Sequence, residues 1–113
     1  MKKIIFFVPV KDAEVVKEAM FEAGAGRMGN YEKCSFEMLG TGQFRPIKGA
    51  NPTIGKVDQI ERVKELRIEM ICDDKILKKV VMALKESHPY EEPAFDIIEL
   101  FNLSTSIKRN DYL

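Results

Sequence analysis

The single histidine of the chain lies in a short segment rich in side chains that can act chemically. The stretch His88-Pro-Tyr-Glu-Glu-Pro-Ala-Phe-Asp96 places an imidazole beside a phenol, two adjacent carboxylates and two prolines. An imidazole with carboxylates can hold a divalent metal or transfer protons. Prolines fix the local backbone, as expected of an ordered loop that displays binding groups. The segment therefore predicts an ordered corner that takes part in binding.

Two interpretations of this corner remain open. In the first, His88, Glu91 and Glu92 bind a divalent metal, although adjacent glutamates normally point apart and one short loop makes a strained cage. In the second, the corner is structural. His88 then lies near a helix C-terminus, where a cation or donor is favourable, and Tyr90 packs at the edge of a sheet.

A glycine-containing stretch is the second candidate site. Gly40-Thr-Gly-Gln-Phe-Arg-Pro46 combines glycines, which permit close backbone approach, with donor side chains for an anion or carboxylate. The density of glycine and proline predicts a loop over residues 40–56. Loops of this length in compact domains are often functional, so two interpretations remain open here: binding or partner contact, and a mobile hairpin connection.

Other patterns argue against familiar chemistries. Gly24-Ala-Gly-Arg-Met-Gly29 matches the dinucleotide fingerprint by letter, but it follows a helical pattern and enters a strand, the reverse of the required order. Cys34 and Cys72 lack C-x-x-C spacing and are interpreted as small core residues, with a soft-metal or redox pair as the alternative. No serine has a readable histidine–aspartate arrangement. An independent enzyme is therefore the least favoured class.

Composition bounds the remaining possibilities. With 113 residues, 45% hydrophobic and 32% charged, the chain is expected to form one domain over residues 1–101, followed by a polar tail at 102–113. Eighteen basic residues balance 18 acidic ones, which disfavours nucleic acid and anionic membranes as partners. The apolar run Ile4–Val10 is too short to span a membrane, so we expect a cytoplasmic protein.

Apolar periodicity predicts four strands and two helices. The expected strands are Lys3–Val10, Tyr31–Leu39, Leu66–Cys72 and Phe95–Phe101. One helix is expected after a cap at Asp12, and the other after a cap at Asp73 or Asp74. The cap and the apolar positions of the first helix recur in the second at a constant offset, which indicates an internal repeat.

The resulting order, β-α-β-β-α-β, predicts an α+β ferredoxin-like fold. Its four-stranded antiparallel sheet has the order 4-1-3-2, with two helices on one face. This topology brings the turn after Val10, the 40–56 loop and the His88–Pro93 corner to one end of the sheet. It places Cys34 and Cys72 at the other end, which excludes a zinc cluster with His88 inside one subunit.

Several spaced motifs also resemble a known family. They are Gly26-Arg-Met-Gly-Asn-Tyr31, Cys34-Ser-Phe36, Gly40-Thr-Gly42-x-Phe44-Arg-Pro46, Gly49-Ala-Asn-Pro52, Ile54-Gly55 and His88–Asp96. Together they resemble the insert domain of the YqfO family, also called Nif-three-like proteins, over most of the chain. In that family the insert is similar to the PII signalling and CutA proteins, so the resemblance implies a PII/CutA-like homotrimer.

The resemblance also bears on activity. Longer family members carry the insert within a dinuclear-metal domain whose ligands include several histidines, whereas this chain has one histidine. We therefore expect a stand-alone form of the insert, without transfer of a hydrolase or GTP cyclohydrolase-like activity. By analogy with PII trimers, a ligand would bind in a cleft between subunits, at the 41–46 loop and the 88–92 corner.

The sequence thus favours a non-catalytic, homo-oligomeric binding or regulatory module that needs no cofactor. It would sense a small ligand or dock a protein partner, with Arg45 pairing an anionic group and Tyr90 offering a stacking or hydrogen-bonding edge. One alternative is a CutA-like protein that binds a divalent metal through His88 with Glu91 or Glu92 across subunits. Another is an accessory subunit of a dinuclear-metal hydrolase. The expected ligand-binding residues are Thr41, Gly42, Phe44, Arg45, His88 and Tyr90.

Overall fold

The protein is built around one antiparallel sheet in the computed structural model, which describes residues 1–101. The strands are β1 (Lys2–Pro9), β2 (Phe36–Phe44), β3 (Glu61–Cys72) and β4 (Phe95–Glu99). Their order across the sheet is β2-β3-β1-β4, which is 4-1-3-2 counted from the other edge. The predicted ferredoxin-like fold is confirmed. The predicted tail at 102–113 lies outside the described residues.

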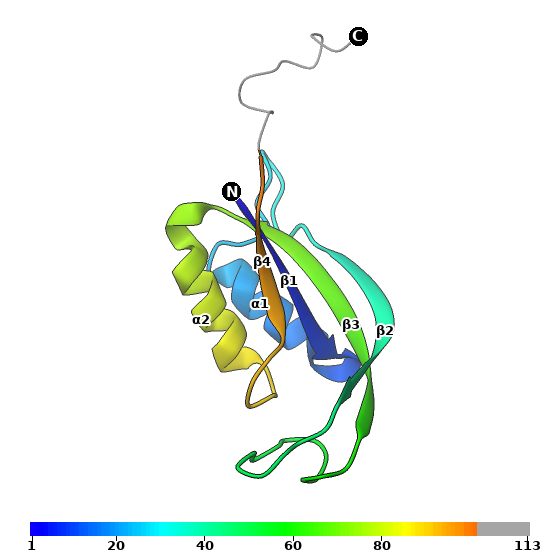
Figure 1. Ribbon diagram of the computed structural model, residues 1–113. Helices are drawn as coiled ribbons and strands as arrows, with labels where there is room; N and C mark the ends of the chain where they lie inside the picture. Colours follow the sequence, from blue (N-terminus) through cyan, green and yellow to red (C-terminus); the bar gives the residue numbers. More distant parts are fainter. Residues whose placement is uncertain (102–113) are drawn as a thin grey trace.

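Both helices cover the same face of the sheet (Figure 1). They are α1 (Ala13–Glu22) and α2 (Leu77–Ser87), and each follows a short 3-10 turn, Val10–Asp12 or Asp74–Ile76. Within residues 1–101, no helix is long and apolar enough to cross a membrane.

The core lies between the helices and this face of the sheet. Ile4, Phe6 and Val8 of β1 are fully buried, because alternate residues of a strand point to the same face. They pack in one cluster with Ile68 of β3 and with buried side chains of both helices, such as Leu84. Full burial of each such side chain contributes about 1.5–3 kcal/mol. This apolar layer explains why periodicity alone predicted the fold.

The strand bounds differ from the prediction at the β2–β3 hairpin. The expected strand Tyr31–Leu39 is shifted, because β2 covers Phe36–Phe44, and the 40–44 part of the expected loop is strand. β3 also begins earlier than Leu66, at Glu61. Gly40 and Gly42 pair with β3, and these ladder bonds outweigh the low strand propensity of glycine. The two strands therefore continue as a ribbon beyond β1 and β4 (Figure 1).

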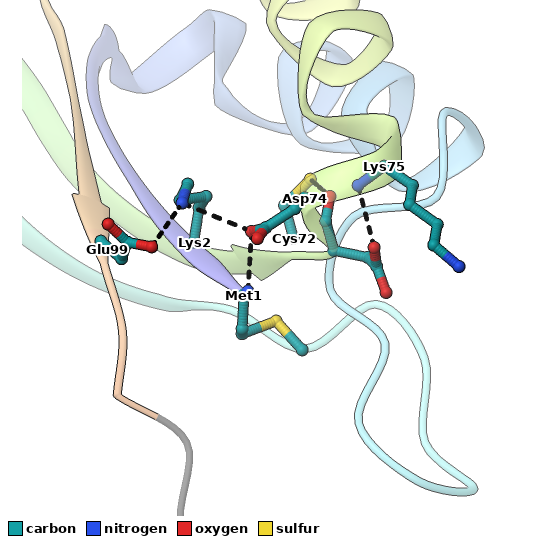
Figure 2. A network of polar contacts seen from close by, with 7 residues as sticks. Met1, Lys2, Cys72, Asp74, Lys75 and Glu99 are labelled. Carbon is teal, nitrogen blue, oxygen red and sulfur yellow. Dashed lines mark hydrogen bonds and ion pairs between the residues drawn. The ribbon is translucent and has the colours of Figure 1, made fainter.

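Ion pairs join the elements at the end of the sheet remote from this ribbon tip. Figure 2 shows Lys2 between Asp74, at 3.6 Å, and Glu99, at 3.1 Å, while the Met1 amino group contacts Asp74 at 2.7 Å. These contacts connect the start of β1 with the end of β4 and the turn before α2. Since the acidic partners are exposed, solvent screens these pairs and each contributes little to stability.

The two expected caps behave differently. Asp73 accepts a hydrogen bond from the backbone N–H of Lys75 at 2.9 Å and so caps the 3-10 turn that leads into α2, whereas Ile76, at the N-cap of α2 itself, makes no side-chain capping bond. Asp12 occupies the N-cap position of α1 but makes no side-chain capping bond, so the capping bond expected there is wrong. Its Oδ2 atom is buried without a hydrogen-bond partner among the described residues, which costs free energy instead of contributing it.

We therefore expect Asp73→Ala to lower the free energy of unfolding by about 1 kcal/mol, because a capping bond is lost. Asp12→Ala is the matched control and is expected to change it less. Urea unfolding followed by circular dichroism, at one fixed protein concentration, measures both. A larger loss for Asp12→Ala would contradict the assignment of the caps.

Candidate functional site

A cleft of about 670 Å³ opens on the sheet face opposite the helices. Phe7, Glu65 and Arg67 form its floor, and strand alternation places them opposite the core residues Phe6 and Leu66. Its walls are β2 from Met38 onward, part of the β2–β3 connection between Arg45 and Ile54, and the corner after α2. Its volume is typical of a small-molecule site.

Hydrogen bonds hold the connection against the corner. The hydroxyl of Thr53 donates to the carbonyl of Pro89 at 2.7 Å, and the backbone N–H of Asn51 donates to Glu91 Oε1 at 3.2 Å. The expected meeting of these two segments at one end of the sheet is thereby confirmed (Figure 1). Asn51 and Glu91 lie 40 residues apart in the chain, so these bonds join two distant segments into the walls of one cleft.

His88 forms the base of the corner and is buried, with 6% of its surface exposed. Its Nε2 contacts the carbonyl oxygen of Phe7 at 2.7 Å, and its Nδ1 accepts from the backbone N–H of Tyr90 at 3.0 Å. A carbonyl oxygen only accepts and a backbone N–H only donates, so these bonds assign the neutral Nε2–H tautomer. Burial lowers the pKa of His88 below its usual value, against the smaller opposing effect of the Phe7 carbonyl.

Tyr90 connects the corner to the floor of the cleft. Its hydroxyl donates to Glu65 Oε2 at 2.7 Å, and burial, followed by this bond, raises the pKa of Tyr90 above its usual value. The Tyr90 ring lies 5.8 Å from the Phe44 ring and 5.0 Å from the His88 ring, centroid to centroid. Glu65 is itself buried, with 8% of its surface exposed. Tyr90 thus lies between an aromatic wall and a buried carboxyl group.

The structure brings most of the expected ligand-binding residues together. Thr41, Gly42, Phe44, Arg45 and Tyr90 all line the cleft. His88 is not among the lining residues, because its ring lies beneath the corner and is occupied by backbone groups. The guanidinium of Arg45 pairs with Asp58 at 3.1 Å, a partner that the sequence did not reveal.

The predicted metal ligands do not form a preassembled set. Both ring nitrogens of His88 are hydrogen-bonded, Glu91 accepts from the backbone of Asn51, and Glu92 lines the cleft. Within the part of the chain that the structure describes, no three histidine, cysteine or acidic side chains are grouped as metal ligands. Coordination by His88 would require breaking one of its two bonds, and metal binding by these residues stays a prediction.

The cysteines fit a core role better at one position than at the other. Cys72 is buried in the core, where burial raises the pKa of its thiol, so it is a poor nucleophile. Cys34 is half-buried, and both thiols are free. The core interpretation is confirmed for Cys72.

Sequence reasoning missed Glu65, the buried acid of the cleft. In the sequence it is one charged residue in Arg62-Val-Lys-Glu-Leu66, beside the apolar positions of β3. Such a residue is normally interpreted as part of a solvated strand face. Its burial depends on Tyr90, which is distant in the chain, so no local pattern indicates it.

The fold is that of CutA-like proteins. The solved structure of CutA1 from Pyrococcus horikoshii superimposes with a TM-score of 0.67, covering 94% of this chain and 89% of that one, at 18% identity. That identity is low, so the likeness concerns the fold alone. The solved Bacillus cereus protein related to NIF3 is closer, with a TM-score of 0.77 and 46% identity over 89% of this chain and 26% of that one.

The sequence matches part of longer relatives. The "GTP cyclohydrolase 1 type 2 homolog" of Halalkalibacterium halodurans is 49% identical over 100 residues, which are 88% of this chain and 27% of that protein. Its namesake in Mycobacterium tuberculosis is 46% identical over 100 residues, 88% of this chain and 26% of that protein. The chain therefore spans about a quarter of the length of the curated relatives it matches. No family model matches it.

The close approach of Gly42 to Glu65 gives a direct test of the cleft floor. A methyl group at Gly42 would overlap Glu65 Oε1, whereas one at Gly40 would meet nothing within 4 Å. Since Tyr90 holds the Glu65 carboxyl group, Gly42→Ala is expected to lower the free energy of unfolding by about 1–3 kcal/mol. Gly40→Ala, the control in the same strand, should leave stability unchanged or slightly raised. Equal effects in urea unfolding would contradict the packing described for Glu65.

The buried neutral His88 predicts a loss of stability on acidification. Its pKa is lower in the fold than in the unfolded chain, where it is near 6.5, so the unfolded state binds the proton first. The free energy of unfolding should therefore fall as the pH drops below about 6.5, by up to about 1.4 kcal/mol per pH unit. Urea titrations between pH 7.5 and 5.5 should show a smaller slope for His88→Gln. Identical slopes for the two proteins would contradict the assignment.

Proposed function

We propose that the chain is a non-catalytic, homo-oligomeric binding module that senses a small ligand in the cleft beneath Tyr90. The observation that carries the proposal is the cleft itself, whose walls come from distant segments joined by hydrogen bonds. Such preorganisation reduces the entropic cost of ordering a binding site.

The state of the titratable groups favours binding over catalysis. Both ring nitrogens of His88 are hydrogen-bonded to backbone groups. The hydroxyl of Tyr90 donates to Glu65, and the pKa of Tyr90 is raised. A general acid or base needs a proton that it can exchange near neutral pH. The longer relatives are named after GTP cyclohydrolase, but this chain matches only about a quarter of their length. The activity in that name is therefore not proposed for this chain.

The uncovered sheet face supports self-association. Phe36 is 62% exposed, Met38 48% and Ile98 44%, and strand alternation places all three opposite the helices. Large apolar side chains gathered on one uncovered face usually mark an interface. A second copy of the chain is the occupant we propose, because the resemblance to PII and CutA proteins implies a homotrimer. The cleft opens on this same face, so a neighbouring copy would border it.

The proposal predicts a defined oligomer in solution. Light scattering of the purified chain should give the mass of a trimer, and Phe36→Glu should shift it toward the monomer, because a charge would be buried in the interface. Val15→Glu changes a 66% exposed apolar residue on α1 and is the matched control, expected to keep the wild-type mass.

A monomeric wild type at micromolar concentration would contradict homo-oligomerisation. It would leave the uncovered face as a docking surface for a different protein. Loss of the oligomer in Val15→Glu with retention in Phe36→Glu would place the interface on the helical face instead.

A further inference from the structure

We infer that the cleft selects a ligand that carries a cationic nitrogen, such as an ammonium, amidinium or guanidinium group, on an apolar body. This inference rests on the proposed function, since it names the ligand class of the same cleft. It reverses the expectation, based on Arg45, that the ligand is an anion.

The basic side chains of the cleft already have acidic partners. Arg45 pairs with Asp58 at 3.1 Å, and Arg67 pairs with Glu69 at 3.2 Å. Neither of these acids lines the cleft. An anionic ligand would have to compete with a carboxylate for each guanidinium, so the positive charge available to it is reduced.

The acidic side chains of the cleft have neutral partners. Glu65 accepts from the Tyr90 hydroxyl and Glu91 from the backbone N–H of Asn51, while Glu92 also lines the cleft. Three acidic side chains thus line the cleft against two basic ones, and a neutral donor leaves the negative charge of its acidic partner in place. A cation is therefore attracted by the negative electrostatic potential near these carboxylates.

Glu65 is the strongest recognition element. Only 8% of its surface is exposed, and a carboxylate buried to this extent is costly unless a cation pairs with it. Within residues 1–101 the Tyr90 hydroxyl is the one group that donates to its side chain, at Oε2. Since a carboxylate has about four acceptor sites, Oε1, beside Gly42, can accept from a ligand.

The remaining lining favours an organic cation over a bare metal ion. The cleft has apolar surface that suits an apolar ligand body, from Phe7 in the floor and from Met38, Phe44, Pro52 and Ile54 in the walls. Phe44 and Tyr90 also present aromatic rings, which attract cations. A divalent metal needs several ligand atoms together, and the described residues contain no such group of three.

Three probes of the same shape test the inference. Benzamidine, benzamide and benzoate carry a cationic, a neutral and an anionic head on one phenyl ring. Each is titrated into the full 113-residue chain, and amide chemical shifts are followed by NMR. We expect benzamidine to shift Gly42, Phe44 and Tyr90 in a saturable way, with about tenfold weaker binding of benzamide and benzoate, because they lose a charged hydrogen bond.

Two variants locate the charge that matters. Glu65→Gln is expected to weaken benzamidine binding about tenfold while Tyr90 can still donate to the amide oxygen. Glu86→Gln removes the same charge from an exposed position of α2 and should leave binding unchanged. If Glu65→Gln fails to fold, the comparison of the three probes on the wild-type chain still decides.

Two results would overturn the inference. Benzoate binding in the cleft as tightly as benzamidine would overturn the charge preference, yet it would leave the cleft as the binding site of the proposed function. Absence of saturable shifts with benzamidine, or shifts that Glu65→Gln does not weaken, would overturn the role of Glu65. Homo-oligomerisation is judged separately, by the light-scattering masses of the wild type and Phe36→Glu.

Discussion

The hydrogen bond between His88 and the Phe7 carbonyl is the contact on which the rest of the site depends. The Phe7 N–H donates toward the β4 side, to Ala94, so the Phe7 carbonyl also points to that side. β4 begins only at Phe95, so the strand ladder leaves this carbonyl without a partner. His88 donates to it from the end of α2, and a partly buried carbonyl that would otherwise lack a partner is satisfied.

This bond continues into the cleft. With Nε2 fixed as donor, Nδ1 accepts from the Tyr90 backbone and orients the turn, and the Tyr90 hydroxyl in turn holds Glu65. Each hydrogen bond in this series orients the group that makes the next one. Because these groups are at least partly buried, losing one bond would leave the next group without its orienting partner. The histidine thus has a positioning role, whereas Tyr90, Glu65 and the β2 glycines belong to the lining of the proposed ligand cleft.

The fold was predictable because the buried side chains recur at the regular spacing of a strand or helix, as Ile4, Phe6 and Val8 do in β1. The extent of β2 was not, since Gly40 and Gly42 indicate a loop unless their pairing with β3 is known. At the site, the histidine corner and the 41–46 segment were found from composition and topology. Glu65 and the Arg45–Asp58 pair were not, because both depend on contacts between distant residues that no single-sequence pattern encodes.

The most direct test of this account is a long-range proton–nitrogen NMR spectrum of the imidazole at pH 7. His88 is the only histidine of the chain, so its ring signals are assigned without ambiguity. We expect a neutral ring with the proton on Nε2, as required by the Phe7 carbonyl and the Tyr90 N–H. A neutral ring protonated on Nδ1, or an imidazolium, would contradict it.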